Sequence, residues 1–480
     1  MKRRSTWRIR IGLLWAVAVL GFVVASGRVE ADDDKDFEVW TIDQSNSPGQ
    51  NFGGTLYIYN GQDLIEDAGA AVPEVVDLGG TASALCLAET GANAVRPHIV
   101  LFNTGHTHAI IAFVASGHVV FMETATRTPA KCLRMSVGAG GLLQAHAAFP
   151  APNNAYVIVA NQNGKLLERI NTDANENGIP YEGASDIVHD TAATLNLASC
   201  TTPNGVACET PGVAPRPNNA VICPIIDRNS TLTFVTLAGG GLLVVDTRTG
   251  DAAPPIVAEY ANSTIHPNGC GGMQKGVLTD SRIYLNSGAG GTNVAEADLY
   301  SLPLAAFPTA PAFNPPDTPA PTVVFSFDTE GHDSHGMLLN RVRQQRFLWV
   351  ADRAANTIEV ADTTTDTHVN TFSLVNAHSA DPAPDLLELA PNGAHAFVTF
   401  RGPCPLTANI AVNNAVGATP GVGVLKVLQG GRTGALVGVA PINNVDGSIV
   451  SCAPAGAPAS NNRADAHGIA VRVLDEDVDD

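Results

Sequence analysis

A repeated unit within residues 96–168 constrains the fold of this chain more than any other feature. Each copy has a polar lead residue, a short apolar strand, a turn, a second apolar strand, a glycine-containing hairpin and a third strand. The lead residues, His98 and His146, are 48 residues apart. Three or four short strands per repeat at roughly this period (about 40–50 residues) are typical of a β-propeller blade. The spacing therefore predicts an all-β fold built from blades.

The rest of the chain contains five further lead segments. They begin near residues 219, 266, 335, 385 and 467. Residues 36–60 hold two strands without a lead strand, and the segment at 465–474 supplies a strand without partners. We therefore expect a single seven-bladed β-propeller over residues 32–480, closed by pairing of the C-terminal strand with the N-terminal blade. Such closure leaves no open sheet edge.

Residues 1–31 have the composition of an export signal. Five basic residues lie within the first ten positions, an apolar run covers residues 11–25, and a small-x-small site precedes Asp32. This order predicts a secretory signal peptide, with an uncleaved anchor as the alternative. The apolar run is short for a membrane span, so we expect no stable span after cleavage and a periplasmic or secreted protein.

The charge of the chain argues against two classes of partner. Removal of residues 1–31 takes away six of the 27 basic and one of the 46 acidic residues, which leaves a net charge of −24. Such a surface repels nucleic acid and anionic membranes. A small molecule or a metal ion is the expected ligand.

Eight cysteines in an exported chain predict disulfides. Cys200 and Cys208 flank a short polar segment and would close a small loop. The other expected pairs join neighbouring repeats: Cys86–Cys132, Cys223–Cys270 and Cys404–Cys452. No two cysteines have the CxxC spacing of a structural zinc site.

Four polar or proline-rich segments are expected to be rim insertions. They cover residues 173–215, 305–322, 403–421 and 440–464. Rim loops are where propellers usually carry their specific features.

The blade pattern resembles the YVTN or YncE-like bacterial propellers. The seventh repeat has Leu-Ala-Pro-Asn-Gly at 389–393, followed by Ala-Phe-Val-Thr-Phe at 396–400. The sixth has Val-Ala-Asp-Arg-Ala-Ala-Asn-Thr-Ile-Glu-Val at 350–360. The resemblance covers nearly all of the mature chain and implies the fold. It implies little about function, because that family includes binding, surface and enzymatic proteins.

The lead residues form the main candidate site. Innermost strands of a propeller converge on the central channel, so residues at equivalent lead positions form a ring. We expect this ring to contain His98, His146, His266, His335, Asp385 and His467, with Asn219 at the fourth blade. Imidazoles together with a carboxylate are suitable ligands for copper, zinc, iron or manganese. The alternative is that each histidine bonds the backbone of the next blade and holds the ring together.

If the ring binds a metal, its arrangement resembles that of the copper propellers. Nitrous oxide reductase and thiocyanate dehydrogenase place a histidine cluster at the axis of a seven-bladed ring. The resemblance implies copper as the cofactor, but it does not extend to sequence motifs. No cupredoxin-like segment follows the propeller, which argues against a reductase of the first type.

Residues 173–182 resemble the start of a calcium loop. Asp173, Asn175 and Asn177 alternate before Gly178, as in an EF-hand. The EF-hand pattern then fails, because Ala184 occupies the position of its bidentate glutamate, and Glu182 or Asp186 would have to substitute. A plain solvated turn is the alternative.

Three functions remain open from the sequence. The first is an exported binding protein with a histidine-rich axial site. The second is a copper-dependent oxidoreductase acting on a small inorganic or sulfur-containing substrate. The third is a non-catalytic surface or interaction scaffold.

Overall fold

The computed structural model separates residues 1–31 from residues 32–480. It describes residues 36–474 except 249, 251, 268, 278, 289–296, 308–317, 328–330, 341–344, 407–415 and 451–459. The expected signal peptide therefore lies outside the described residues.

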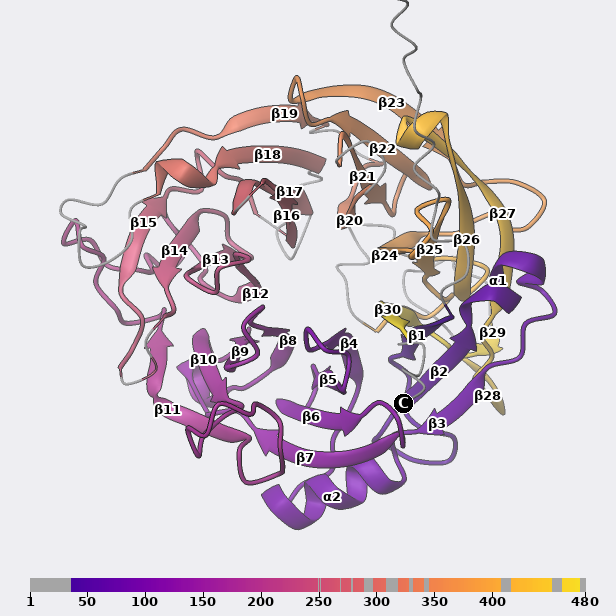
Figure 1. Cartoon of the computed structure of the whole chain (residues 1–480), viewed down its shortest axis with the longest axis horizontal. Helices are drawn as coiled ribbons and strands as arrows, with labels where there is room; N and C mark the ends of the chain where they lie inside the picture. Colours follow the sequence, from indigo (N-terminus) through magenta and orange to yellow (C-terminus); the bar gives the residue numbers. More distant parts are fainter. Residues whose placement is uncertain are drawn as a thin grey trace, which may run out of the picture. The chain divides into compact units, whose positions relative to one another are not determined.

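Residues 36–474 form a seven-bladed propeller, and each blade is a four-stranded antiparallel sheet (Figure 1). From the inner to the outer strand, blade 1 is β30 (Ala466–Val473), β1 (Phe37–Asp43), β2 (Thr55–Asn60) and β3 (Glu74–Asp77). Blade 2 is β4 (Pro97–Phe102), β5 (His108–Phe113), β6 (His118–Glu123) and β7 (Thr128–Arg134). Blade 3 is β8 (Ala145–Pro150), β9 (Tyr156–Asn161), β10 (Leu166–Asn171) and β11 (Val188–Asn196). Blade 4 is β12 (Val221–Ile226), β13 (Leu232–Leu237), β14 (Leu242–Asp246) and β15 (Ile256–Tyr260).

The remaining blades repeat this order. Blade 5 is β16 (Gly271–Lys275), β17 (Asp280–Gly288), β18 (Ala297–Pro303) and β19 (Thr322–Ser326). Blade 6 is β20 (Ser334–Leu339), β21 (Phe347–Asp352), β22 (Thr357–Asp362) and β23 (Thr367–Ser373). Blade 7 is β24 (Pro384–Leu389), β25 (His395–Phe400), β26 (Gly421–Leu428) and β27 (Thr433–Pro441).

The ring closes as the sequence predicts. β30 pairs antiparallel with β1, from Phe37 opposite Val473 to Asp43 opposite Ala466. The inner strands contact one another in a closed cycle, β30–β4–β8–β12–β16–β20–β24 and back to β30. They lie nearest the centre of the ring in Figure 1. Each blade thus presents one end of its inner strand to a shared axial space.

The burial of each strand decides whether its apolar pattern can be recognised in the sequence. The middle strands pack against neighbouring blades on both faces, so β5, β13 and β21 are buried at every residue. Outer strands such as β3 and β7 are partly exposed and carry polar residues. The outer strands therefore lack the apolar run that marks the inner ones.

Two short helices follow strands of blade 1: α1 (Gly61–Asp67) connects β2 to β3 and packs against blade 7, and α2 (Thr81–Thr90) connects β3 to blade 2. In α1 the side chain of Asn60 caps the first turn by accepting hydrogen bonds from two backbone amides. The longer helix, α2, ends at Gly91, whose φ of 77° suits a glycine. Single-turn 3₁₀ segments occur at Ala139–Gly141, Leu304–Ala306 and Gln429–Gly431.

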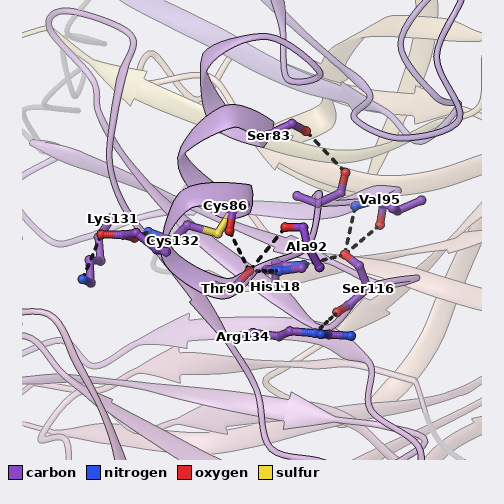
Figure 2. Close-up of a disulfide and its surroundings, with 12 residues drawn as sticks. Ser83, Cys86, Thr90, Ala92, Val95, Ser116, His118, Lys131, Cys132 and Arg134 are labelled. Carbon is purple, nitrogen blue, oxygen red and sulfur yellow. Dashed lines mark hydrogen bonds and ion pairs between the residues drawn. A yellow bond between two sulfur atoms is a disulfide. The ribbon is translucent and has the colours of Figure 1, made fainter.

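The disulfide Cys86–Cys132 attaches α2 to the outer strand of blade 2 (Figure 2). Beside it, the Thr90 hydroxyl donates to the Cys86 carbonyl and lies 2.8 Å from Nε2 of His118. Nδ1 of that histidine lies 2.9 Å from the Ser116 hydroxyl. His118 is buried, and burial lowers its pKa to about 4. It is a packing residue at this seam between α2 and blade 2.

Two other expected disulfides are present. Cys200–Cys208 closes the small loop, and Cys223–Cys270 joins β12 of blade 4 to the segment before β16 of blade 5. The fourth expected pair, Cys404–Cys452, includes a residue outside the described part. Among the described residues no cysteine is free.

The insertions contain more regular structure than the sequence suggests. Residues 173–215 include β11, the outer strand of blade 3, and the Cys200–Cys208 loop. Residues 440–464 include a two-stranded sheet of β28 (Val445–Val450) and β29 (Ser460–Asn462). The segments at 305–322 and 403–421 lie partly outside the described residues. No helix in the described part of the chain is long and apolar enough to cross a membrane.

Candidate metal centre

Five of the predicted site residues occupy the second position of an inner strand. They are His98 in β4, His146 in β8, His335 in β20, Asp385 in β24 and His467 in β30. In each of these strands the pairing register with the next strand shifts at that position. Such a β-bulge turns a side chain away from the regular alternation of a strand. The same local irregularity therefore occurs at all five residues.

The five residues come from consecutive blades around the ring, in the order 6, 7, 1, 2 and 3. The rings of His98 and His467 are stacked, with centroids 3.8 Å apart. His146 lies on the other side of His98, with ring centroids 4.6 Å apart. Potential ligand atoms of His335, Asp385 and His467 all lie within 4.8 Å of one another. The structure thus brings the five residues together as two adjoining sets, His335 with Asp385 and His467, and His98 with His146, which meet at the stacked rings of His98 and His467. These five residues are called the axial cluster.

The hydrogen-bond partners of His98 and His146 assign their tautomers. Nδ1 of His98 lies 2.7 Å from Oε1 of Gln44, whose Nε2 donates to Asp465. Nδ1 of His146 lies 2.8 Å from the carbonyl oxygen of Ile222. Both partners can only accept, so each Nδ1 carries the hydrogen of a neutral imidazole. Each Nε2 is therefore left with a lone pair.

The two Nε2 atoms of His98 and His146 face each other at 3.2 Å. Two lone pairs at this separation repel unless a cation or a proton lies between them. Two nitrogens bound at about 2.1 Å to one tetrahedral metal ion would be roughly 3.4 Å apart. The observed separation therefore fits a pair of ligands to one ion.

His467 follows the same rule. Its Nδ1 lies 3.0 Å from the backbone carbonyl of His98, and its Nε2 lies 3.7 Å from Oδ2 of Asp385. The carbonyl accepts from Nδ1, which again leaves a lone pair on Nε2. His146 and His467 each bond the backbone of the next blade, as the alternative interpretation of the sequence expects. These bonds use Nδ1 only, so the two interpretations are compatible.

Burial keeps the three imidazoles neutral. The pKa of His146 is lowered to about 4, mainly by burial. The pKa values of His98 and His467 are lowered well below the ordinary value by burial. For His98, the neighbouring His467 and His146 act in the same direction. A neutral imidazole is the form that binds a metal ion.

Asp385 supplies the negative charge of the cluster. Burial by itself would raise its pKa, but His335, His467 and Arg401 hold the pKa well below its usual range. Nη1 of Arg401 donates to Oδ2 of Asp385 at 2.7 Å, and both side chains are fully buried. The other edge of Arg401 binds Asp465 through Nε at 2.6 Å and Nη2 at 2.9 Å. The bidentate pair with Asp465 fixes the guanidinium of Arg401, which in turn holds the carboxylate of Asp385 through one hydrogen bond.

His335 is more exposed than Asp385, the other cluster residue from blades 6 and 7. Its Nδ1 is in close contact with Oδ1 of Asp385, and 16% of its side chain is exposed. His467 and Asp385 are exposed by 1% or less. The cluster is therefore closed by protein around His467 and partly open beside His335 and His146, both of which are only partly buried.

His266 lies apart from the lead positions. It precedes β16, where its Nδ1 is 2.8 Å from Oδ2 of Asp298, and Tyr300 donates to the same carboxylate oxygen. The sequence pattern placed it in the fifth lead segment, but the second residue of β16 is Gly272.

Asn219 also differs from the expected lead residue. The inner strand of blade 4 begins at Val221, and its register shift lies between Val221 and Pro224. Nδ2 of Asn219 donates to the carbonyls of Leu197 and Cys208, so this side chain holds a loop.

Two further histidines, His106 and His332, have local partners. His106 accepts a hydrogen bond from the backbone of Val473 on Nδ1. His332 pairs with Asp352 at 2.6 Å, and the carboxylate raises the pKa of the histidine. His378 is exposed.

Three residues of the cluster's surroundings were missed by sequence reasoning: Gln44, Arg401 and Asp465. Gln44 and Asp465 are 421 residues apart and meet only because the ring closes. Arg401 immediately follows β25 and is an arginine with no exposed side-chain surface. Its position directly after a buried strand is the only signal that could have indicated it.

Comparison with known proteins supports the fold. No protein-family model matches the sequence, and no curated protein matches it significantly. A protein from Lactobacillus plantarum has a TM-score of 0.54 at 11% identity, covering 92% of this chain and 100% of its own. A putative 6-phosphogluconolactonase from Bacteroides fragilis has a TM-score of 0.50 at 11% identity, covering 92% and 99%. One from Bacteroides uniformis has a TM-score of 0.50 at 12% identity, covering 84% and 98%.

These likenesses concern the propeller architecture alone, because the identities are low and one fold serves many functions. The seven-bladed β-propeller is the structural class of this chain.

Proposed function

We propose that this chain is an exported propeller whose axial cluster of His98, His146, His335, Asp385 and His467 binds one transition-metal ion. The observation that carries the proposal is the pair of Nε2 atoms of His98 and His146, 3.2 Å apart with both Nδ1 hydrogens committed elsewhere. Without a cation this arrangement is repulsive. With one, it becomes a pair of ligands.

The donor set favours a particular class of ion. Imidazole nitrogens with one carboxylate suit copper, zinc, iron or manganese rather than calcium or magnesium. The groups that orient the imidazoles are the second requirement of a metal site, and here they are Gln44, the Ile222 carbonyl and the His98 carbonyl. A bound ion would supply a Lewis acid or a redox centre. The protein would supply fixed tautomers and one ionised carboxylate.

Export is part of the proposal. Three disulfides in the described residues suit an oxidising compartment, and residues 1–31 have the order of a signal peptide. The YVTN or YncE-like pattern of the sixth and seventh repeats agrees with a bacterial extracytoplasmic propeller.

Metal analysis of the untagged mature protein, residues 32–480, tests the proposal. Protein from the exported fraction is measured by mass spectrometry as purified and after reconstitution with copper or zinc. We expect about one transition-metal ion per chain. The double variant His146→Ala/His335→Ala should retain less than about a tenth of it, while the exposed control His378→Ala retains all of it. Wild type without metal after both reconstitutions would refute the metal centre and leave a scaffold.

A copper-dependent oxidoreductase is the second candidate. It is favoured by the exposure of the His335 side chain, since catalytic metal sites keep one open position. The test is turnover of small inorganic or sulfur-containing reductants by the copper-loaded protein with an artificial electron acceptor. Activity that vanishes in the double variant supports the enzyme. Full metal occupancy without turnover assigns the site to metal binding alone.

A further inference from the structure

The loop between β10 and β11 of blade 3 contains two buried carboxylate oxygens that no donor satisfies. They are Oδ1 of Asp173 and Oδ1 of Asp186, and neither has a hydrogen-bond partner in the described residues. Asp186 is only 1% exposed. A buried carboxylate oxygen without a donor or a cation is costly. Two of them in one loop need a common explanation.

The backbone brings these two residues together. The amide of Ala174, which follows Asp173, donates to the backbone carbonyl of Asp186 at 3.1 Å. The loop leaves Asp173, turns at Gly178, which has φ of 81°, and returns through Tyr181 to Asp186. Tyr181 donates its amide to the Thr172 carbonyl at 2.7 Å, so the loop is closed at its base.

In the first half of the loop, backbone amides donate to side-chain oxygens. The Gly178 amide donates to Oδ2 of Asp173 at 3.1 Å, which leaves Oδ1 of that carboxylate directed elsewhere. The side-chain oxygens of Asn175 and Asn177 each accept one backbone amide and keep a second lone pair. Oxygen ligands at alternate positions before a glycine are the pattern by which proteins bind Ca²⁺.

The structure distinguishes between the two residues that could replace the missing glutamate. Glu182 is exposed, and its Oε2 accepts from Nδ2 of Asn177 at 2.6 Å. Asp186 is buried and has the unpartnered oxygen. We infer that residues 173–186 form a calcium site in which Asp173 and Asp186 supply the two carboxylates. Asn175, Asn177 and backbone carbonyls of the loop supply further oxygens, since Ca²⁺ takes 6–8 of them.

The site has a structural consequence for the seam between blade 2 and blade 3. Tyr181, in the middle of the loop, is buried and stacks on His108 with ring centroids 5.1 Å apart. It also contacts Phe121, at 6.2 Å between centroids. Ile187, directly after Asp186, joins the same apolar cluster. Calcium would therefore hold a loop that covers two blades.

The inference is independent of the axial cluster, and its test uses calcium alone. The mature protein is stripped of all metals, dialysed and titrated with CaCl₂ by calorimetry. Its melting temperature is recorded with and without 1 mM Ca²⁺. We expect one calcium per chain and a rise in melting temperature of at least about 5 °C, because a ligand that binds only the folded state stabilises it.

Two variants make the outcome specific. Asp186→Asn should lose the calcium response, and without calcium it should be at least as stable as wild type, because it removes an uncompensated buried charge. Glu176→Gln removes one negative charge from an exposed side chain of the same loop and should keep the full response. The inference is overturned by a wild type that shows no heat and no shift, or by an Asp186→Asn variant that responds like wild type.

Discussion

At the residue scale, the tautomers of three histidines decide what the axial cluster can bind. Nδ1 of His98, His146 and His467 is committed to an acceptor in each case. His146 and His467 donate to backbone carbonyls, which no side-chain substitution removes. His98 depends on the side chain of Gln44, so this residue controls the direction of one lone pair.

Replacing Gln44 should weaken metal binding without removing a ligand. In Gln44→Met, Nδ1 of His98 loses its acceptor and the imidazole can change tautomer or rotate. Loss of such an orienting partner typically costs about 10–100-fold in metal affinity. His378→Ala, which changes an exposed histidine, is the control and should bind the metal as wild type does. Competition titrations against a chelator measure both, and equal affinities for Gln44→Met and wild type would contradict the assigned tautomers.

The histidine cluster should also make the metal-free protein sensitive to acid. The pKa of His146 is about 4 in the folded protein and about 6.5 in the unfolded chain. Above about pH 6.5 the imidazole of His146 is neutral in both the folded and the unfolded protein, so it does not lower the free energy of unfolding there. As the pH falls toward 4 the unfolded chain takes up the proton first, and stability declines.

This dependence can be measured by urea unfolding of metal-stripped protein at pH 7.5 and pH 5. For His146 alone the expected loss at pH 5 is about 2 kcal/mol. His146→Gln should lose less stability between the two pH values than wild type, whereas His378→Ala should lose the same amount. Parallel losses in His146→Gln and wild type would show that other groups control the acid response.

At the element scale, the inner and middle strands can be predicted from the sequence, whereas the two helices and the outer strands cannot. The inner and middle strands are predictable because both faces are buried and their apolar runs are continuous. The lead positions of blades 2, 3, 6 and 7 follow from similar spacings to the next strand, and that of blade 1 follows from its place before the apolar run at 468–471. In blades 4 and 5 the sequence leaves the register less defined, and neither Asn219 nor His266 lies within its inner strand. The helices α1 and α2 and the half-exposed outer strands left no periodic signal strong enough to be recognised.

The disulfide Cys86–Cys132 should stabilise α2 and blade 2 without affecting the axis. It closes a loop between residues 46 positions apart, and a disulfide of this kind is typically worth about 2–4 kcal/mol. The double variant Cys86→Ala/Cys132→Ala should melt at a lower temperature and be cleaved by protease within residues 81–92. Its metal content should equal that of wild type. Loss of the metal would show that the helix supports the axial cluster.

At the scale of the whole molecule, pairing of β30 with β1 both closes the ring and delivers His467. A chain ending at residue 465 lacks the inner strand of blade 1 and leaves the edge of β1 unpaired. We expect it to be recovered mainly as aggregate. A chain ending at residue 474 keeps the whole strand and should fold and bind metal as the full chain does. Circular dichroism, size-exclusion chromatography and metal analysis compare the two, and a folded, metal-loaded chain ending at 465 would contradict this role of β30.

β30 also determines when the axial cluster can form. Gln44 precedes Asp465 by 421 residues and His98 precedes His467 by 369, yet all four meet at the axis. If the chain crosses a membrane unfolded and from its N-terminal side, the proposed cluster can form only after residue 467 has crossed. In that case the proposed metal ion would be acquired in the compartment that the chain enters, and the ions available there would decide which one the protein binds.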